Sequence, residues 1–479
     1  MNSTQRVLLA LGAASLAFLG CSKIAPLTAP AVKSGTADFS RFAAMGTSVT
    51  AGFESAGLVD HHQTHGFPYL FAQQVRTAFT IPSVSPDGIP PLLQVVSFSP
   101  LIVSNQGRTQ GSPTNFAQPT AYNNMGVPGA LLFDAADTSG YASNPMFSII
   151  QRGRGSIVDQ VASLNPTFIS FEYGANEVLG PATEGGTIPV MDAGTYGAIL
   201  SATLDSIQTD CPNAKIAILN IPDVTSIPYV TTFPPVTLDT LGNPVPLIGK
   251  ESGSAAPLSP SDYVLLNAAD SLAVGTGFPT NAISYVSGVP GNGRPLGNDQ
   301  VLSTVEATAI SATVDGYNNA IEIAVANSKV GMAIVDLHGL LKQAATTGIK
   351  IQGSTYTNAY ITGGFFSLDG VHPTDLGYGV ICNQMIASVN QTFGSNIQPV
   401  NLAQAASATS SEAHPASAGK RLLPWIRGSD HMLASILPSR AQLNAALARV
   451  GPPAPARLAA PARHVAPGAA SRVIRGGVR

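Results

Sequence analysis

Short apolar runs alternate with longer stretches of helical periodicity between Phe39 and about Thr392. The short runs predict strands at Phe42–Gly46, Leu93–Phe98, Thr167–Phe171, Lys215–Asn220 and Met332–Asp336. The longer stretches predict helices at Pro68–Phe79, Ile157–Leu164, Tyr196–Gln208, Asp262–Val274, Thr304–Asn327 and Thr374–Val389. Such alternation is typical of an α/β fold, in which helices cover both faces of a parallel sheet. Sheets of this kind bind ligands at the carboxyl ends of their strands.

Two regions depart from this pattern. Residues 222–300 are richer in Pro and Gly and contain one predicted helix, so we interpret them as an insertion over the core that could serve as a lid. Residues 399–479 are rich in Ala, Pro and Arg and are expected to be a disordered tail. Trp425, the single Trp, lies in this tail and is interpreted as an incidental aromatic residue.

The net charge of −3 divides unequally along the chain. Residues 401–479 hold ten Lys and Arg against two Asp and Glu, a charge of +8, so the other 400 residues carry −11. A mildly acidic body offers no electrostatic footprint for nucleic acid, and no nucleic-acid partner is expected.

The N-terminus has the pattern of an export signal. Arg6 precedes the apolar run VLLALGAASLAFLG, which ends at Cys21 and is too short for a comfortable membrane span. FLGC resembles a bacterial lipobox, although Phe18 and Leu19 are bulkier than usual there. We therefore expect a signal peptide at 1–20, lipidation of Cys21, a tether at 21–38 and a protein attached to the outer membrane of a bacterial cell envelope. Plain secretion is the alternative.

The other two cysteines leave two possibilities open. An exported protein can oxidise Cys211 and Cys382 to a disulfide, or both can be buried thiols.

Ser48 stands directly after the first predicted strand and before a helix-like segment. Backbone N–H groups at the start of a helix favour negative charge, so a serine there could attack a carbonyl while its own amide holds the oxyanion. The alternative is a helix N-cap, which is the usual role of serine at such a junction.

Asp369 and His372 lie together in SLDGVHPTD, immediately before the last predicted helix. A serine hydroxyl needs a base to take its proton, and the base needs an acid to orient it. An Asp-x-x-His turn can supply both groups. A turn Asp beside a surface His, or a pair of metal ligands, are the alternatives.

Three further segments carry polar side chains with a possible chemical role. YNNMGVPG (122–129) and FEYGANEV (171–178) could supply donors for an oxyanion, or could simply be turns. DHHQTH (60–65) could bind a metal, but we expect it to line the entrance to a pocket and bind none.

Taken in order, GTSVTAG, NNMGVPG, GANE and DGVHP resemble the four sequence blocks of the SGNH (GDSL-type) hydrolase family. The resemblance covers roughly Phe39–Val389, and NIPDVTSIP resembles a stretch of lipoprotein members of that family. It implies a flavodoxin-like three-layer α/β/α fold over residues 39–398, with a central parallel sheet and no cofactor or metal.

The resemblance also implies roles for individual residues. Ser48 would be the nucleophile, His372 the general base and then the acid, and Asp369 the residue that orients His372. The oxyanion hole would consist of the Ser48 N–H, the Gly129 N–H and the Asn176 side chain, with Gly126 as the alternative glycine.

Two positions depart from the family pattern. The usual Gly-Asp-Ser-Leu is Gly-Thr-Ser-Val here, so Thr47 replaces a carboxylate, and Glu177 replaces the usual Asp after Asn176. Thr47 is expected to tune the site, and the longer Glu177 to strain its loop. The chain contains no Gly-x-Ser-x-Gly, which argues against an α/β-hydrolase elbow.

The resulting hypothesis is an exported serine esterase that cleaves a lipid, short-chain or glycan-linked ester. One alternative is a non-catalytic lipoprotein with the same fold that binds a lipid or glycan. The other is a surface factor that acts through the basic tail.

Overall fold

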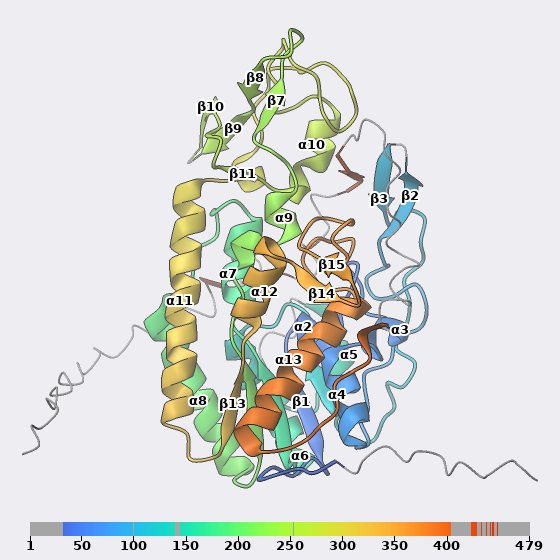
Figure 1. Ribbon diagram of the computed structural model, residues 1–479, viewed down its shortest axis with the longest axis vertical. Helices are drawn as coiled ribbons and strands as arrows, with labels where there is room; N and C mark the ends of the chain where they lie inside the picture. The colour runs from blue at the N-terminus through green and yellow to red at the C-terminus, as the bar shows by residue number, and fades with distance from the viewer. Residues whose placement is uncertain are drawn as a thin grey trace, which may run out of the picture.

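A computed structural model describes residues 32–98, 100–138, 144–251, 253–403 and 423–428, with a few further positions between 433 and 448. The expected signal peptide, Cys21, most of the tether and most of 399–479 lie outside the described residues. Within the described part, the chain folds around one parallel sheet with helices on both sides (Figure 1). No helix among these residues is long and apolar enough to cross a bilayer.

The central sheet has five parallel strands in the order β13-β6-β5-β1-β4. They are β1 (Phe42–Gly46), β4 (Asn124–Gly126), β5 (Phe168–Glu172), β6 (Lys215–Leu219) and β13 (Met332–Val335). Numbered along the chain, this is the 2-1-3-4-5 order of flavodoxin-like folds. The order reverses between β1 and β5, and the carboxyl ends of these two strands are where such a fold places its ligand. The predicted α/β class is confirmed.

Side chains of the sheet alternate between two apolar clusters. In β1, Phe42 and Ala44 belong to one cluster, and Ala43 and Met45 belong to the other. The first cluster is covered by α4 (Phe67–Val75) and α13 (Asp375–Phe393). The second is covered by α6 (Ile157–Ser163), α8 (Ala193–Asp210) and α11 (Thr304–Ala326). All five residues of β1 are buried, as expected for a parallel strand covered on both faces.

Most predicted helices form, and their ends are set by capping side chains. Asp192, Ser303 and Thr374 accept N–H bonds at the starts of α8, α11 and α13. The predicted helix at Asp262–Val274 is reduced to α10 (Ala269–Ala273). The helix-like segment expected after the first strand is α2 (Ser48–Ala51), which begins at Ser48 itself. The sequence analysis missed α3 (Asp60–Gln63), α5 (Pro145–Ile150), α7 (Ala175–Thr183), α9 (Pro228–Thr231) and α12 (Leu337–Thr346).

The second predicted strand lies outside the central sheet. β2 (Gln94–Phe98) pairs antiparallel with β3 (Leu101–Ser104), and Val96 and Phe98 are more than half exposed. The strand beside β1 is instead β4, inside the segment that was predicted to be a loop. β4 has only three residues, two of them Asn and Gly, so its sequence shows no apolar run.

Residues 222–300 contain two small hairpins besides short helices and loops. β7 (Val236–Leu238) pairs with β8 (Pro244–Pro246), and β9 (Ile248–Glu251) pairs with β10 (Ser254–Pro257). Figure 1 shows these hairpins gathered at one end of the molecule, beyond α9. Two further pairs are β11 (Tyr263–Val264) with β12 (Val301–Leu302) and β14 (Ile349–Ile351) with β15 (Ser354–Tyr356).

Trp425 is not an incidental aromatic residue. It belongs to β16 (Trp425–Ile426), which pairs with β3, and its ring N–H donates to Asp270 Oδ1 at 2.6 Å. The Gly428 N–H donates to the other oxygen of the same carboxylate at 2.6 Å. These contacts attach residues 423–428 to the α10 region. Residues 423–428 belong to the tail that the sequence predicted to be disordered.

Cys211 and Cys382 are both buried and free. Of the two possibilities, a disulfide or two buried thiols, the structure therefore has the buried thiols. Burial raises the pKa of both, and the Asp210 charge adds to the effect at Cys211.

The aromatic cluster on the α4–α13 face predicts a large stability cost for one truncation. The Phe168 ring centroid lies 4.9–6.0 Å from those of Phe39, Phe42, Phe71 and Phe393. Phe168→Ala should therefore lower the free energy of unfolding by about 3–5 kcal/mol in chemical denaturation. Ile323→Ala, at a position 53% exposed on α11, should stay within about 0.5 kcal/mol of the parent. Similar losses for both variants would contradict the cluster's role.

Candidate active site

Ser48 lies at the switch point of the sheet. It is the first residue of α2, two residues after β1 ends at Gly46, and it is 4% exposed. Gly46 is required there because a Cβ would lie 2.2 Å from Thr50 Oγ1 and 2.6 Å from the Glu172 carbonyl oxygen. The glycine thus allows α2 to turn tightly against β5, and this tight turn presents Ser48 at the carboxyl end of the sheet.

His372 and Asp369 extend from Ser48 in one hydrogen-bonded chain. Ser48 Oγ lies 2.8 Å from His372 Nε2, and His372 Nδ1 lies 2.8 Å from Asp369 Oδ2. All three side chains are buried. The second bond sets Nδ1 as the protonated nitrogen and leaves Nε2 to accept the serine proton. The structure therefore brings together the three predicted residues in the order that nucleophilic catalysis requires.

Backbone donors hold Asp369 in its charged form. Its Oδ1 accepts the N–H groups of Val371 and His372 at 2.9 and 2.8 Å, and its Oδ2 accepts the Ala56 N–H at 2.8 Å. Burial raises the pKa of this carboxyl, but the His372 charge and these hydrogen bonds outweigh burial, so the pKa lies below its ordinary value. Asp369 can therefore orient His372 as an anion.

A carboxylate that the sequence analysis missed holds the start of α2. Glu172 ends β5 opposite Gly46, and its Oε2 accepts the N–H groups of Thr47 and Thr50 at 3.0 and 3.2 Å. Both threonine hydroxyls also donate to it at 2.9–3.0 Å. These four donors flank Ser48, so Glu172 fixes the turn that carries the nucleophile.

Glu172 brings a carboxyl group to the place where Thr47 lacks one. Burial raises the pKa of Glu172, and the bonds from Thr47 and Thr50 lower it only in part. The sequence held a signal for this residue, because a Glu ends the otherwise uncharged strand FISFE. Thr47 serves as one of its hydrogen-bond donors.

The proposed oxyanion donors are only partly assembled. Asn176 lines the same cavity as Ser48 and His372, and one of its amide hydrogens is already donated to the Ala130 carbonyl at 2.8 Å. Gly129 has a φ of 79° and does not line that cavity. Gly126 is part of β4, and its N–H donates to Asn124 Oδ1 at 3.0 Å. In the described part of the chain, neither Ser48 nor Gly129 uses its N–H in a hydrogen bond, whereas Gly126 does.

Glu177 fits its loop instead of straining it. It is fully buried on α7, and its Oε1 accepts the Leu132 N–H at 2.6 Å. The neighbouring Asn176 donates to the carbonyl of Ala130, which lies two residues before Leu132. α7 therefore holds the 130–132 segment at two points. Burial raises the pKa of Glu177 to about 7, although the Leu132 N–H acts against the rise.

The cavity beside Ser48 is small and apolar. Its volume is about 80 Å³. Apart from Ser48, His372, Asn176 and Thr47, the side chains that line it are Val49, Ala175, Leu179, Pro222, Val224, Ile227, Leu337, Leu340, Leu341, Phe365, Phe366, Val371, Pro373 and Ile381. Pro222, Val224 and Ile227 come from the start of the predicted insertion, which therefore contributes one wall.

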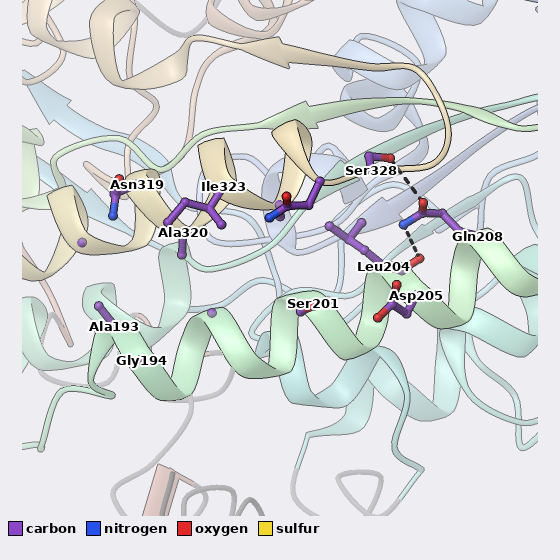
Figure 2. A pocket seen from close by; sticks show the side chains of 14 residues that line it. Ala193, Gly194, Ser201, Leu204, Asp205, Gln208, Asn319, Ala320, Ile323 and Ser328 are labelled. Atoms are coloured by element: carbon purple, nitrogen blue, oxygen red, sulfur yellow. Dashed lines mark hydrogen bonds between the residues drawn. The ribbon is translucent and has the colours of Figure 1, made fainter. Parts of the chain in front are cut away.

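A larger hollow of about 450 Å³ lies between α8 and α11 (Figure 2). Figure 2 shows small and polar side chains along both helices, with Ser328 bonded to Gln208 at one end. Asp205 is the one titratable group that lines it. The hollow thus lacks a nucleophile-base pair, and the chemistry is concentrated at Ser48.

The histidines of DHHQTH do not line the cavity at Ser48. His61, His62 and His65 gather around Asp375, in the first turn of α13, and Glu54 approaches His62 from the interior. The partner of the DHHQTH segment is therefore the Asp375 carboxylate, which is more than three hundred positions later in the sequence.

The high pKa of Glu177 predicts a pH-dependent stability cost. The folded pKa of about 7 exceeds the ordinary value of 4.5, so between these pH values the folded state binds the proton more tightly. Ionisation of Glu177 therefore does not lower the free energy of unfolding below pH 4.5, and lowers it by the full amount above pH 7. Glu177→Gln should therefore gain about 2–3 kcal/mol of unfolding free energy relative to the parent as pH rises from 4.5 to 8.

Denaturation at several pH values measures this gain. Glu322→Gln, which removes an exposed carboxylate on α11, is the matched control and should leave the unfolding free energy unchanged. A pH-independent effect of Glu177→Gln would contradict the buried, protonatable state.

No protein-family model matches the chain, and no curated protein matches it. Among solved structures, the chain is similar to a "putative GDSL-like lipase" from Parabacteroides merdae at 11% identity and a TM-score of 0.33, over 75% of this chain and 99% of that one. A likeness at this score carries no argument about fold or activity, so the proposal below depends on the geometry of the site.

Proposed function

We propose that the protein is a serine hydrolase of the SGNH (GDSL) type that cleaves carboxylic esters through an acyl-enzyme. The observation that carries the proposal is the chain of two 2.8 Å contacts from Ser48 through His372 to Asp369. The serine and the histidine are 324 positions apart, yet both lie at the carboxyl end of the same sheet. Such an arrangement is the basis of nucleophilic catalysis on several unrelated folds.

In the acylation step, Ser48 Oγ attacks the ester carbonyl carbon while its proton passes to His372 Nε2. The carbonyl oxygen becomes an oxyanion, and the Ser48 N–H and the remaining Asn176 amide hydrogen are the donors at hand. The C–O bond to the alcohol then breaks, and His372 gives its proton to the departing oxygen. Asp369 stabilises the imidazolium during this step.

In the deacylation step, His372 Nε2 takes a proton from water as the water oxygen attacks the acyl carbon. The bond to Ser48 Oγ breaks, the proton returns to Ser48, and the acid leaves. The products are one alcohol and one carboxylic acid, and no cofactor is consumed.

The cavity supports a short, apolar acyl group. Its walls include Leu340, Leu341, Phe365 and Phe366, and its volume of about 80 Å³ leaves little room for a long chain. Burying an apolar acyl group there contributes about 0.8 kcal/mol per CH₂. We therefore propose a short-chain ester as the preferred substrate.

Export belongs to the same proposal. The apolar run before Cys21 supports secretion with lipidation of that cysteine, which would place the esterase on a membrane of the cell envelope. Globomycin-sensitive processing in a bacterial host is the direct check of the lipid anchor.

The chain of contacts from Ser48 through His372 to Asp369 predicts that a serine-reactive probe labels one serine. A fluorophosphonate should modify Ser48 of the full chain, as located by mass spectrometry, and Ser48→Ala and His372→Ala should abolish the adduct. Hydrolysis of a short-chain ester should fall by about 10³-fold or more in both variants. Ser201→Ala on α8 is the matched control and should keep full activity. A folded parent without adduct or turnover would favour a binding lipoprotein.

The Glu172 contacts predict a role in positioning the nucleophile. Glu172→Gln places an amide NH₂ against the donors of Thr47 and Thr50, so the start of α2 must shift. We expect kcat to fall about 10–100-fold with KM within about twofold, since misplacement of a catalytic group costs rate more than binding. Asp205→Asn, in the hollow between α8 and α11, is the control. An unchanged kcat in a folded Glu172→Gln protein would refute this role.

A further inference from the structure

A cluster of five ionisable side chains lies outside the Ser48–His372–Asp369 relay. Its members are Asp375 and the four side chains around it, which are Glu54, His61, His62 and His65. Asp375 lies three residues after His372 in the first turn of α13, whereas the histidines lie on α3 and the turn that follows it. The ester mechanism uses none of these groups.

Asp375 divides the cluster into an inner and an outer half. On the inner side, its Oδ1 lies 3.0 Å from His62 Nδ1, which in turn lies 3.4 Å from Glu54 Oε2. On the outer side, its Oδ2 lies 3.7 Å from His61 Nε2 and 3.9 Å from His65 Nδ1. The imidazoles of His61 and His65 thus lie near Oδ2 of Asp375, whereas Oδ1 is already in contact with His62.

Burial and charge make this carboxylate a strong ligand. The side chains of Asp375, Glu54 and His62 are 2%, 1% and 5% exposed. Two carboxylates close together in a buried site favour a compensating positive charge.

The outer half is open to solvent. The side chains of His61 and His65 are 63% and 29% exposed, so an ion can reach Asp375 Oδ2 without unfolding the protein. His61 lies on α3 and His65 in the turn that follows it, and their ring centroids are 4.9 Å apart.

The spacing suits a small transition-metal ion. One ligand atom from each of His61, His65 and Asp375 lie within 4.8 Å of one another. Tetrahedral zinc with bonds of 2.0–2.2 Å to nitrogen and oxygen keeps its ligands about 3.3–3.6 Å apart. The 3.7 Å between His61 Nε2 and Asp375 Oδ2 is close to this value, and rotation of exposed side chains can close the rest.

Two of the three proposed ligands, His65 and Asp375, also have a partner of the kind that orients metal ligands. His65 Nδ1 lies 2.8 Å from the His61 carbonyl oxygen and can donate to it, so Nε2, and not the Nδ1 that lies 3.9 Å from Asp375 Oδ2, is the nitrogen that would bind the ion. His62 holds the inner oxygen of Asp375 and leaves the outer one available.

We propose that His61, His65 and Asp375 bind one divalent cation of the zinc class, with His62 and Glu54 supporting Asp375 from the interior. The site has three protein ligands and an open fourth position for water. Because it joins α3 to the turn after His372, the bound ion stabilises the segment that leads into α13. The inference is independent of the ester chemistry, and it departs from the expectation that DHHQTH binds no metal.

Zinc titration of the full chain tests the proposal. After chelator treatment and dialysis, isothermal titration with Zn²⁺ should show one site of micromolar or tighter affinity, and Zn²⁺ should raise the melting temperature by several degrees. Mg²⁺ and Ca²⁺ should bind much more weakly, because imidazole ligands favour transition metals.

The paired variant His61→Ala/His65→Ala separates this site from other histidines. Both side chains are on the surface, so the variant should fold, and its Zn²⁺ affinity should fall at least tenfold with loss of the melting shift. Asp60→Asn, which alters the neighbouring exposed carboxylate, should bind Zn²⁺ as the parent does. Absence of Zn²⁺ binding by the parent, or equal binding by the paired variant, would overturn the proposal.

Discussion

The hydrogen bonds between Glu172 and the start of α2 are the interaction on which the site depends. β1 and β5 meet at the switch point of the sheet, and Gly46 brings α2 close enough for Glu172 to bind both Thr47 and Thr50. Ser48 lies between these two threonines and has little freedom to move. A carboxyl group on the neighbouring strand thus fixes Ser48, which its own segment, only four helical residues long, would hold loosely.

The other half of the site is held by a second set of local contacts. Asp369 is bound by the N–H of Ala56, and the Tyr378 hydroxyl on α13 donates to the carbonyl of Phe53, whose ring lies 4.8 Å from the His372 ring. The turn at 53–56 therefore touches the acid, the base and α13 together. Since Glu54 is part of this turn and faces the Asp375 cluster, a cation bound there would reinforce the geometry of the relay from its outer side.

Ser48, Asp369 and His372 could be singled out from the sequence because they sit in strong local contexts. Ser48 follows an apolar strand, and Asp369 and His372 precede a helix started by Pro373 and capped by Thr374. β4 could not be predicted, because three residues gain strand structure only from their pairing with β1. The contacts of Glu172 and Asp375 were equally hidden, since each depends on a partner more than one hundred residues away.

The charge around the site constrains the substrate. Several buried carboxyl groups lie in the region around Ser48, and their partners are backbone N–H groups, hydroxyls and imidazoles. Among the residues that the structure describes, no Lys or Arg lines the cavity at Ser48. An anionic group would enter this cavity without a counterion and beside the negative charge of Asp369, which is costly in an apolar setting. A neutral ester avoids that cost until the oxyanion forms, and at that moment His372 has become a cation. For the esterase that we propose, this distribution of charge favours neutral esters over anionic ones, because the positive charge on His372 would appear only during the reaction.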